Sequence, residues 1–167
     1  MPFSPIPRGV YPSVTSLDPK KLKEKGITLV LADLDNTLVP YKVLEPSNEV
    51  AAWMAALKEE GIDLFLLSNS RKPGRAQKFA QQVGIPYQGH SGKPKKAGYL
   101  KAMERMGRTP QETVMVGDQI FTDPLGANRA GVTGRPRISR SWSGVTVMEK
   151  RMEDMVTPPC PNFSNVI

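Results

Sequence analysis

Three short apolar runs, spaced along the chain, constrain the fold more than any other feature of the sequence. Residues 27–32 (ITLVLA), 62–67 (IDLFLL) and 113–116 (TVMV) are rich in branched side chains and contain few polar ones. A run without polar alternation is typical of a strand that is covered on both faces, as in a parallel sheet. Helical patterns separate the runs, and this alternation predicts an α/β fold. We therefore expect a parallel β-sheet flanked by helices.

Capping residues mark the helices between these strands. Asp18 and Ser47 are suited to N-caps, and glycines follow several of the expected helix ends. The elements expected from these signals are a helix that starts at Pro19, one between Ser47 and Gly61, three over residues 72–83, 95–106 and 121–130, and a short strand near Ile85. Right-handed crossovers would place the carboxyl end of every strand at one edge of the sheet, where α/β proteins bind ligands.

Both ends of the chain are rich in proline. Four prolines lie in the first twelve residues and three in the last ten, and proline removes a backbone hydrogen-bond donor. We therefore expect irregular segments over residues 1–16 and 151–167, around one domain over residues 17–150. The lone cysteine, Cys160, excludes an internal disulfide, and no apolar run is long enough for a membrane span or a secretory signal. These features indicate a cytoplasmic protein.

Acidic side chains directly follow the first and third apolar runs. Asp33 and Asp35 come after the first run, and Asp118 and Asp123 come after the third. If these strands are neighbours, three or four carboxylates converge and repel one another, and a bound cation is the usual relief. Carboxylate oxygens suit Mg²⁺, which often shares its site with a phosphate. The two pairs together predict a Mg²⁺ site, whereas either pair alone fits ordinary cap and turn residues equally well.

Further polar residues are expected beside these acids. Ser68 and Asn69 follow the second run, where a hydroxyl and an amide could bind a phosphate oxygen, although both are also common loop residues. Lys93 lies in a basic loop, where it could neutralise the charge of a phosphate or remain solvated. The combination points to phosphate chemistry at the edge of the sheet.

A set of short strings resembles the four motifs of the haloacid dehalogenase superfamily: Asp33-x-Asp35-x-Thr37, Ser68-Asn69, the Lys93-Pro94 step, and Gly117-Asp118 with Asp123. The longer strings LADLDNTLVP, LLSNS and VGDQIFTDPLGANRAG are similar to the bacterial YqeG branch of subclass IIIA, which is related to phosphatidylglycerophosphate phosphatases. The resemblance covers residues 18–132 and implies a Rossmann-like fold. Many members insert a cap domain after the first motif, but the ten residues from Thr37 to Pro46 are too few for one.

The resemblance implies a role for each matched acid. Asp33 would be the nucleophile that attacks phosphorus and forms an aspartyl-phosphate. Asp35 would protonate the leaving alkoxide and then deprotonate the attacking water. The Mg²⁺ ion would be held by the Asp33 carboxylate, the backbone carbonyl of Asp35 and Asp118.

The resemblance also implies roles for the residues around these acids. Ser68 and Lys93 would hold the transferring phosphoryl group. Asn69 belongs to the same phosphate-binding set, as the residue that shapes the loop. Thr37 and Asp123 would support the site, with Asp123 either near the metal or bracing Lys93.

The sequence departs from the family pattern after Val132. A further apolar strand is expected there, but residues 133–140 are polar and contain a proline, so they cannot form a central strand. Either the sheet lacks this strand, or residues 145–148 (VTVM) replace it.

Positive charge is concentrated in the middle of the chain. Residues 71–108 contain ten basic residues and one acid, whereas the whole chain carries a net charge of +7. Such asymmetry predicts an anionic partner, although a solvated basic face is the simpler alternative. Because no cap covers the site, we expect a phosphate on a large substrate, such as a lipid headgroup, with peripheral binding to an anionic membrane. Lys72, Arg75 and Lys78 are expected on one helix, and Lys101 and Arg105 on the next.

Three classes of function fit parts of this pattern. A Mg²⁺-dependent phosphomonoester hydrolase fits all of it, acting on phosphatidylglycerophosphate or another large phosphate, or alternatively on a soluble metabolite, nucleotide or phosphoprotein. A receiver-like signalling domain is disfavoured because Asp33 and Asp35 follow the same strand. A basic nucleic-acid-binding module would leave the acids without a purpose and lacks an aromatic-rich strand, so we expect no nucleic-acid partner.

Overall fold

The computed structural model describes residues 10–72, 74–119, 122–132 and 137–138. Its centre is a sheet of four parallel strands in the order β4-β3-β2-β5. The strands are β2 (Leu29–Ala32), β3 (Asp63–Leu67), β4 (Tyr87–Gln88) and β5 (Thr113–Val116). The three apolar runs therefore form neighbouring strands, and the predicted α/β parallel sheet is confirmed.

The central strands are in register, so their carboxyl ends lie side by side. Ala32 at the end of β2 is opposite Leu66 of β3 and Val116 of β5. The loops that follow these strands therefore leave the sheet at the same edge. This alignment brings together polar residues that are far apart in the sequence.

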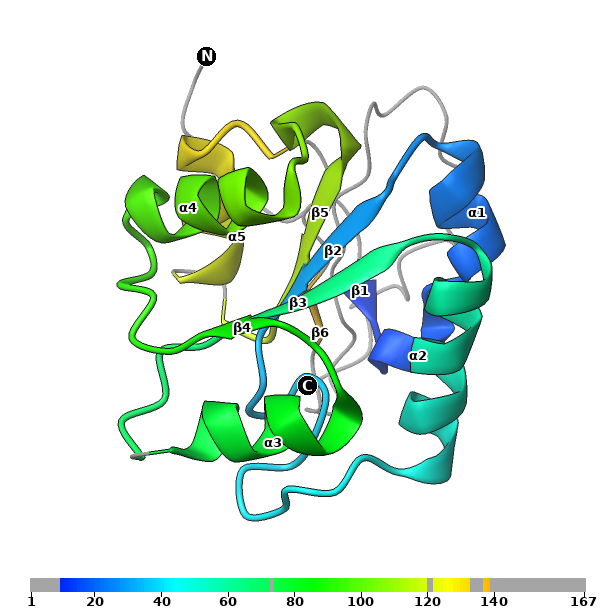
Figure 1. Cartoon of the computed structure of the whole chain (residues 1–167), viewed down its shortest axis with the longest axis vertical. Helices are drawn as coiled ribbons and strands as arrows, with labels where there is room; N and C mark the ends of the chain where they lie inside the picture. The colour runs from blue at the N-terminus through cyan, green and yellow to red at the C-terminus, as the bar shows by residue number, and fades with distance from the viewer. Residues whose placement is uncertain (1–9, 73, 120–121, 133–136, 139–167) are drawn as a thin grey trace, which may run out of the picture.

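In the described part of the chain, five α-helices cover the sheet: α1 (Pro19–Glu24), α2 (Asn48–Glu59), α3 (Arg75–Val83), α4 (Lys96–Met106) and α5 (Asp123–Arg129). Helices α4 and α5 lie on one face, and α1, α2 and α3 lie on the other (Figure 1). The alternation within β2 explains the two layers, because Leu29 and Leu31 pack with Tyr99 of α4, whereas Val30 packs with Trp53 of α2. Apolar burial on both faces is the main source of stability.

The helix boundaries follow the capping signals in most places. Asp18 accepts a hydrogen bond from the backbone N–H of Lys20 at 2.9 Å, and Ser47 accepts one from Val50 at 3.3 Å. Helix α3 begins three residues later than expected because Gly74, with φ of 72°, has a left-handed backbone conformation. Lys72 consequently precedes the helix.

The described part of the N-terminal segment is ordered, in contrast to the irregular segment expected over residues 1–16. Strand β1 (Val10–Tyr11) pairs in parallel with β6 (Arg137–Ile138) in a separate two-stranded sheet, and a 3-10 turn, η1 (Val14–Ser16), follows. Val14 is fully buried against the main core, which extends the packed structure to this segment.

The region after Val132 is only partly described. As expected, β6 is not a strand of the four-stranded sheet. Residues 139–167, which include the alternative strand at 145–148 and the expected tail, lie outside the described residues. The domain limits 17–150 remain a prediction. Among the described residues, none of the helices has the length and apolar composition of a membrane span.

Candidate active site

The candidate site lies at the carboxyl edge of the sheet, where the loops after β2, β3 and β5 meet. The backbone N–H of Asp33 donates to Val116 of β5 at 2.9 Å, so the first loop begins beside the third. Ser68 connects in the same way to the β4 side, because its N–H donates to Gln88 at 3.0 Å and its carbonyl accepts from Ser91 at 3.1 Å. Backbone pairing alone thus brings the four motif segments together.

Lys93 lies at the centre of this edge, on the loop between β4 and α4. Its Nζ is 2.8 Å from Oδ1 of Asp33 and 2.6 Å from Oδ1 of Asp123, and the side chain is almost completely buried. Burial alone would lower the pKa of Lys93, but the carboxylates of Asp123 and Asp33 outweigh this effect and raise it. Lys93 is therefore a permanent cation in direct contact with two acids.

The two acids that contact Lys93 form a cluster with a third, Asp118. Oxygens of Asp33, Asp118 and Asp123 lie within 4.8 Å of one another. Burial and repulsion from Asp33 raise the pKa of Asp118 to about 6. Burial also raises the pKa of Asp123, against the opposing effect of Lys93.

This acid cluster fits a divalent cation. When all three carboxylates are ionised, one ammonium leaves the cluster with two uncompensated negative charges, which a divalent ion would balance. Oxygen donors are also the ligands that hard cations prefer. Because both oxygens of Asp123 already accept hydrogen bonds, from Lys93 and from the backbone N–H of Gln119, Asp33 and Asp118 are the better-placed ligands.

Asp35 does not join this cluster, so three of the four acids converge, at the lower end of the expected three or four. Its Oδ1 accepts a hydrogen bond from Nε of Arg75 at 2.7 Å. The same guanidinium donates through Nη2 to the carbonyls of Pro40 at 3.1 Å and Val43 at 2.7 Å. Arg75 is buried, with 7% of its surface exposed, so the prediction that it contributes to a basic surface is wrong.

The loop of the first motif turns sharply. Asn36 has φ of 57°, and its N–H donates to Val39 at 2.7 Å, which returns the chain beside Asp35. Thr37 is buried in this turn, and its Oγ1 has no hydrogen-bond partner among the described residues. No helix or strand lies between Thr37 and Ser47, which agrees with the absence of a cap at this position.

Asn69 connects two of the site loops. Its Nδ2 donates to the carbonyl of Lys93 at 2.9 Å, and its Oδ1 accepts from the Ser91 hydroxyl at 2.8 Å and from the N–H of Lys93 at 3.1 Å. These bonds hold the loop after β3 against the loop that carries Lys93. Ser68 is buried, and its Oγ accepts from the N–H of Ser70 at 3.1 Å, so its hydroxyl proton is available for donation.

Two further residues hold the loop of the last motif. The Tyr99 hydroxyl donates to the carbonyls of Thr122 at 2.8 Å and Asp123 at 3.2 Å. A Cβ atom at Gly117 would lie 2.1 Å from Oδ2 of Asp123, so only glycine permits this close approach. The sequence does not predict that Tyr99 and Arg75 contact the site loops. No local pattern distinguishes Tyr99 from an ordinary core residue or Arg75 from an ordinary surface residue.

Comparisons with known proteins identify the family of this chain. The sequence profile of the haloacid dehalogenase-like hydrolases matches residues 9–131. The probable phosphatase YqeG of Bacillus subtilis is 32% identical over 126 residues, covering 75% of this chain and 73% of that protein. The chloroplastic and mitochondrial phosphatidylglycerophosphate phosphatase 1 of Arabidopsis thaliana is 34% identical over 129 residues, covering 69% of this chain but 35% of that protein.

A solved structure supports the fold. The cobalt-bound deoxy-D-mannose-octulosonate 8-phosphate phosphatase of Haemophilus influenzae gives a TM-score of 0.53 at 19% identity, covering 69% of this chain and 70% of that one. The profile match spans most of the chain and includes every loop of the candidate site. The chain therefore belongs to the haloacid dehalogenase-like hydrolase family, as a phosphatase of its YqeG-like and phosphatidylglycerophosphate phosphatase-like branch.

Proposed function

We propose that this phosphatase is a Mg²⁺-dependent phosphomonoester hydrolase that works through an aspartyl-phosphate. The observation that carries the proposal is the position of Lys93, whose ammonium contacts Asp33 while Asp118 lies in the same acid cluster. A cation touching the nucleophile is positioned to neutralise a phosphoryl group as it is transferred.

In the first step, a carboxylate oxygen of Asp33 attacks phosphorus. The phosphorus–oxygen bond to the alcohol breaks, and the leaving oxygen takes a proton from the carboxyl group of Asp35. In the second step, a water molecule gives a proton to Asp35 and attacks the aspartyl-phosphate, which releases inorganic phosphate and restores Asp33. Lys93 and the Ser68 hydroxyl bind the phosphoryl oxygens in both steps.

The acid cluster supplies the metal site of this proposal. The Asp33 and Asp118 carboxylates and the backbone carbonyl of Asp35 would hold Mg²⁺, in agreement with the charge that the three carboxylates leave uncompensated. When bound, the ion would neutralise charge on the phosphoryl group. Asn69, Thr37 and Asp123 support the site: Asn69 holds the Lys93 loop, Thr37 fills the turn and Asp123 braces Lys93.

The test of this mechanism is phosphate release by the Asp33→Asn variant. The amide is nearly isosteric but cannot attack phosphorus, so turnover is lost while the unfolding transition changes little. Asp18→Asn is the matched control, because asparagine also serves as an N-cap. Activity of Asp33→Asn above a few per cent of wild type, or full activity in excess chelator, contradicts the proposal.

We further propose a phosphorylated lipid headgroup as the substrate. The relative from Arabidopsis thaliana, the short connection from Thr37 to Ser47 and the basic residues around the site support this choice. The test compares phosphate release from phosphatidylglycerophosphate in vesicles with release from the soluble ester glycerol 3-phosphate. A higher kcat/KM for the soluble ester would favour the alternative, a soluble metabolite.

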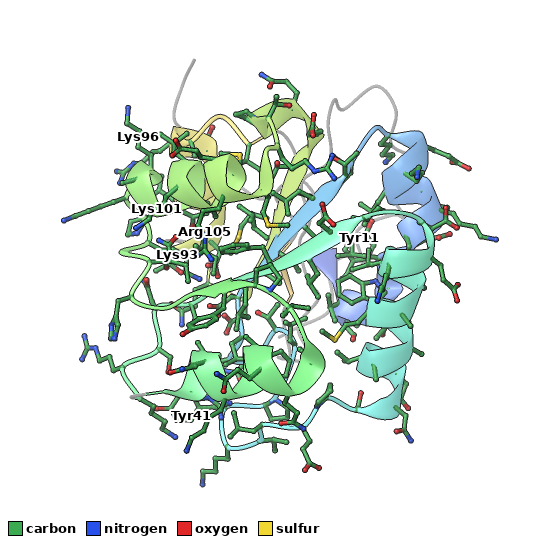
Figure 2. All side chains as sticks on the ribbon, viewed as in Figure 1. Tyr11, Tyr41, Lys93, Lys96, Lys101 and Arg105 are labelled. Carbon is green, nitrogen blue, oxygen red and sulfur yellow. The ribbon has the colours of Figure 1, made fainter. Side chains whose placement is uncertain are left out.

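Peripheral binding to an anionic membrane, at the inner face of the cytoplasmic membrane, belongs to the same proposal. Arg75 and Lys93 are buried and Arg108 pairs with Asp63, so none of these three can contact a membrane freely. The exposed cations of the segment remain available: Arg71, Lys72, Lys78, Lys95, Lys96, Lys101 and Arg105. Figure 2 shows Lys96 and Lys101 on the outer side of α4, directed away from the sheet.

The test of membrane binding is sedimentation with vesicles of neutral and of acidic lipid. Coulombic attraction requires the acidic lipid and weakens as salt is raised, whereas insertion of apolar side chains is much less sensitive to salt. Equal sedimentation with both lipids at low salt would remove membrane binding from the proposal.

A further inference from the structure

A buried arginine outside the four motifs contacts the proposed acid/base residue. Arg75, at the start of α3, donates through Nε to Oδ1 of Asp35 at 2.7 Å and through Nη2 to the carbonyls of Pro40 and Val43. Burying a guanidinium group is costly unless its donors are paired, and here a carboxylate accepts from Nε and two carbonyls accept from Nη2. The arginine therefore has a defined geometry rather than that of a mobile surface cation.

The arrangement restrains the acid without occupying it fully. Among the described residues, the side-chain hydrogen bond to Asp35 is made to Oδ1, so Oδ2 is the oxygen that would carry the proton in transfer. The two carbonyls belong to the segment just after the first motif, so one guanidinium links the turn, the acid and α3. Rotation of Asp35 away from this position requires breaking a charge-assisted hydrogen bond.

We propose that Arg75 is a positioning residue for catalysis, which holds the Asp35 carboxyl group where it can give a proton to the leaving oxygen. The inference rests on the proposed function, in which Asp35 is the general acid. A merely structural arginine would instead only keep the loop from Pro40 to Val43 folded against α3. The two roles predict different kinetics, because only the first depends on how much protonation the leaving group needs.

Leaving groups separate these roles. An alkyl phosphate such as glycerol 3-phosphate releases a strongly basic alkoxide, which needs protonation as the bond breaks. 4-Nitrophenyl phosphate releases a weakly basic phenolate, which leaves without it. Since general acid catalysis contributes roughly 10²–10⁴-fold, displacement of the acid lowers kcat/KM for the alkyl ester by about a hundredfold and for the aryl ester by less than about tenfold.

The experiment measures kcat/KM for both esters in Arg75→Met, which removes the guanidinium, and in Arg75→Lys, which keeps a charge but cannot reach all three acceptors. Arg108→Met is the matched control, because it breaks another 2.7 Å arginine–aspartate pair at the opposite end of β3. We expect the ratio of the two kcat/KM values to change at least about tenfold in Arg75→Met, severalfold in Arg75→Lys and not at all in the control. Thermal unfolding identifies which variants are folded. If Arg75→Met is unfolded, the ratio measured for Arg75→Lys decides the test.

An unchanged ratio in the folded Arg75 variants overturns the inference. Asp35→Asn distinguishes this outcome from failure of the proposed function. If Asp35→Asn lowers kcat/KM selectively for the alkyl ester and the Arg75 variants do not, only the positioning role is wrong. If Asp35→Asn lowers kcat/KM equally for both esters, Asp35 is not the general acid and the proposed mechanism fails.

Discussion

The acid cluster predicts that removal of one carboxylate stabilises the metal-free protein. Burial and then the neighbouring Asp33 raise the pKa of Asp118 from 3.8 to about 6. Above that pH the folded protein must hold a charge that the unfolded chain carries at no cost. Asp118→Asn keeps the shape of the side chain and removes this charge. We therefore expect the variant to be more stable than wild type in excess chelator at neutral pH.

The sign and size of the effect follow from proton linkage. Because the folded state binds the Asp118 proton more tightly than the unfolded state, this group contributes stability below about pH 4, and the contribution is lost as the pH rises through about 6. The rise of the Asp118 pKa from 3.8 to about 6 corresponds to about 3 kcal/mol at ~1.4 kcal/mol per pKa unit. Since Asp118 is partly exposed, solvent screening reduces the expected gain to about 1–2 kcal/mol.

The assay is urea unfolding of wild type and Asp118→Asn with chelator at about pH 4 and about pH 8, and again with Mg²⁺ at about pH 8. The two proteins are expected to be equal at the lower pH, and the variant more stable at the higher one. With Mg²⁺ the order reverses, because only wild type keeps the full ligand set. A variant that is less stable than wild type at the higher pH in chelator refutes the reasoning.

The remaining predictions concern the groups that hold the cluster together. Lys93→Met removes the ammonium between two buried carboxylates, so urea unfolding at neutral pH should show a loss of about 3 kcal/mol, and phosphate release should stop; unchanged stability would contradict this. Tyr99→Phe deletes one hydroxyl that donates to two carbonyls, which costs about 1–2 kcal/mol and lowers kcat severalfold with little change in KM; an equal rise in KM would argue against a positioning effect. Gly117→Ala forces a methyl group into Asp123, and at least about a tenfold loss of kcat is expected; wild-type kcat would show that the loop adapts freely.

The features that sequence reasoning found are those with local causes. A covered strand needs an uninterrupted apolar run, and a helix start needs a cap, so β2, α2 and β5 lie close to their expected positions. The convergence of Asp33 and Asp118 followed from the single topological fact that parallel strands end at one edge.

The features that the sequence did not predict depend on tertiary contacts. Arg75 has the charge and spacing of a surface residue, but it is buried and donates to Asp35 and to the carbonyls of Pro40 and Val43. Tyr99 similarly reads as an ordinary core residue until its hydroxyl is seen to donate to the loop before α5. The pairing of β1 with β6 joins segments more than one hundred residues apart. Each segment is too short to show a sequence pattern that predicts this pairing.

The alignment of strand ends has a consequence for the order of folding. The residues that we propose to bind phosphate and Mg²⁺ are at positions 33, 68, 93 and 118, and the pairing of β3, β2 and β5 brings together the loops that follow these strands. A partly folded chain that lacks β5 has no Asp118 beside Asp33, and so has no complete ligand set. Because ligands can stabilise only states that bind them, we expect Mg²⁺ and phosphate to slow the unfolding rate while leaving the refolding rate nearly unchanged.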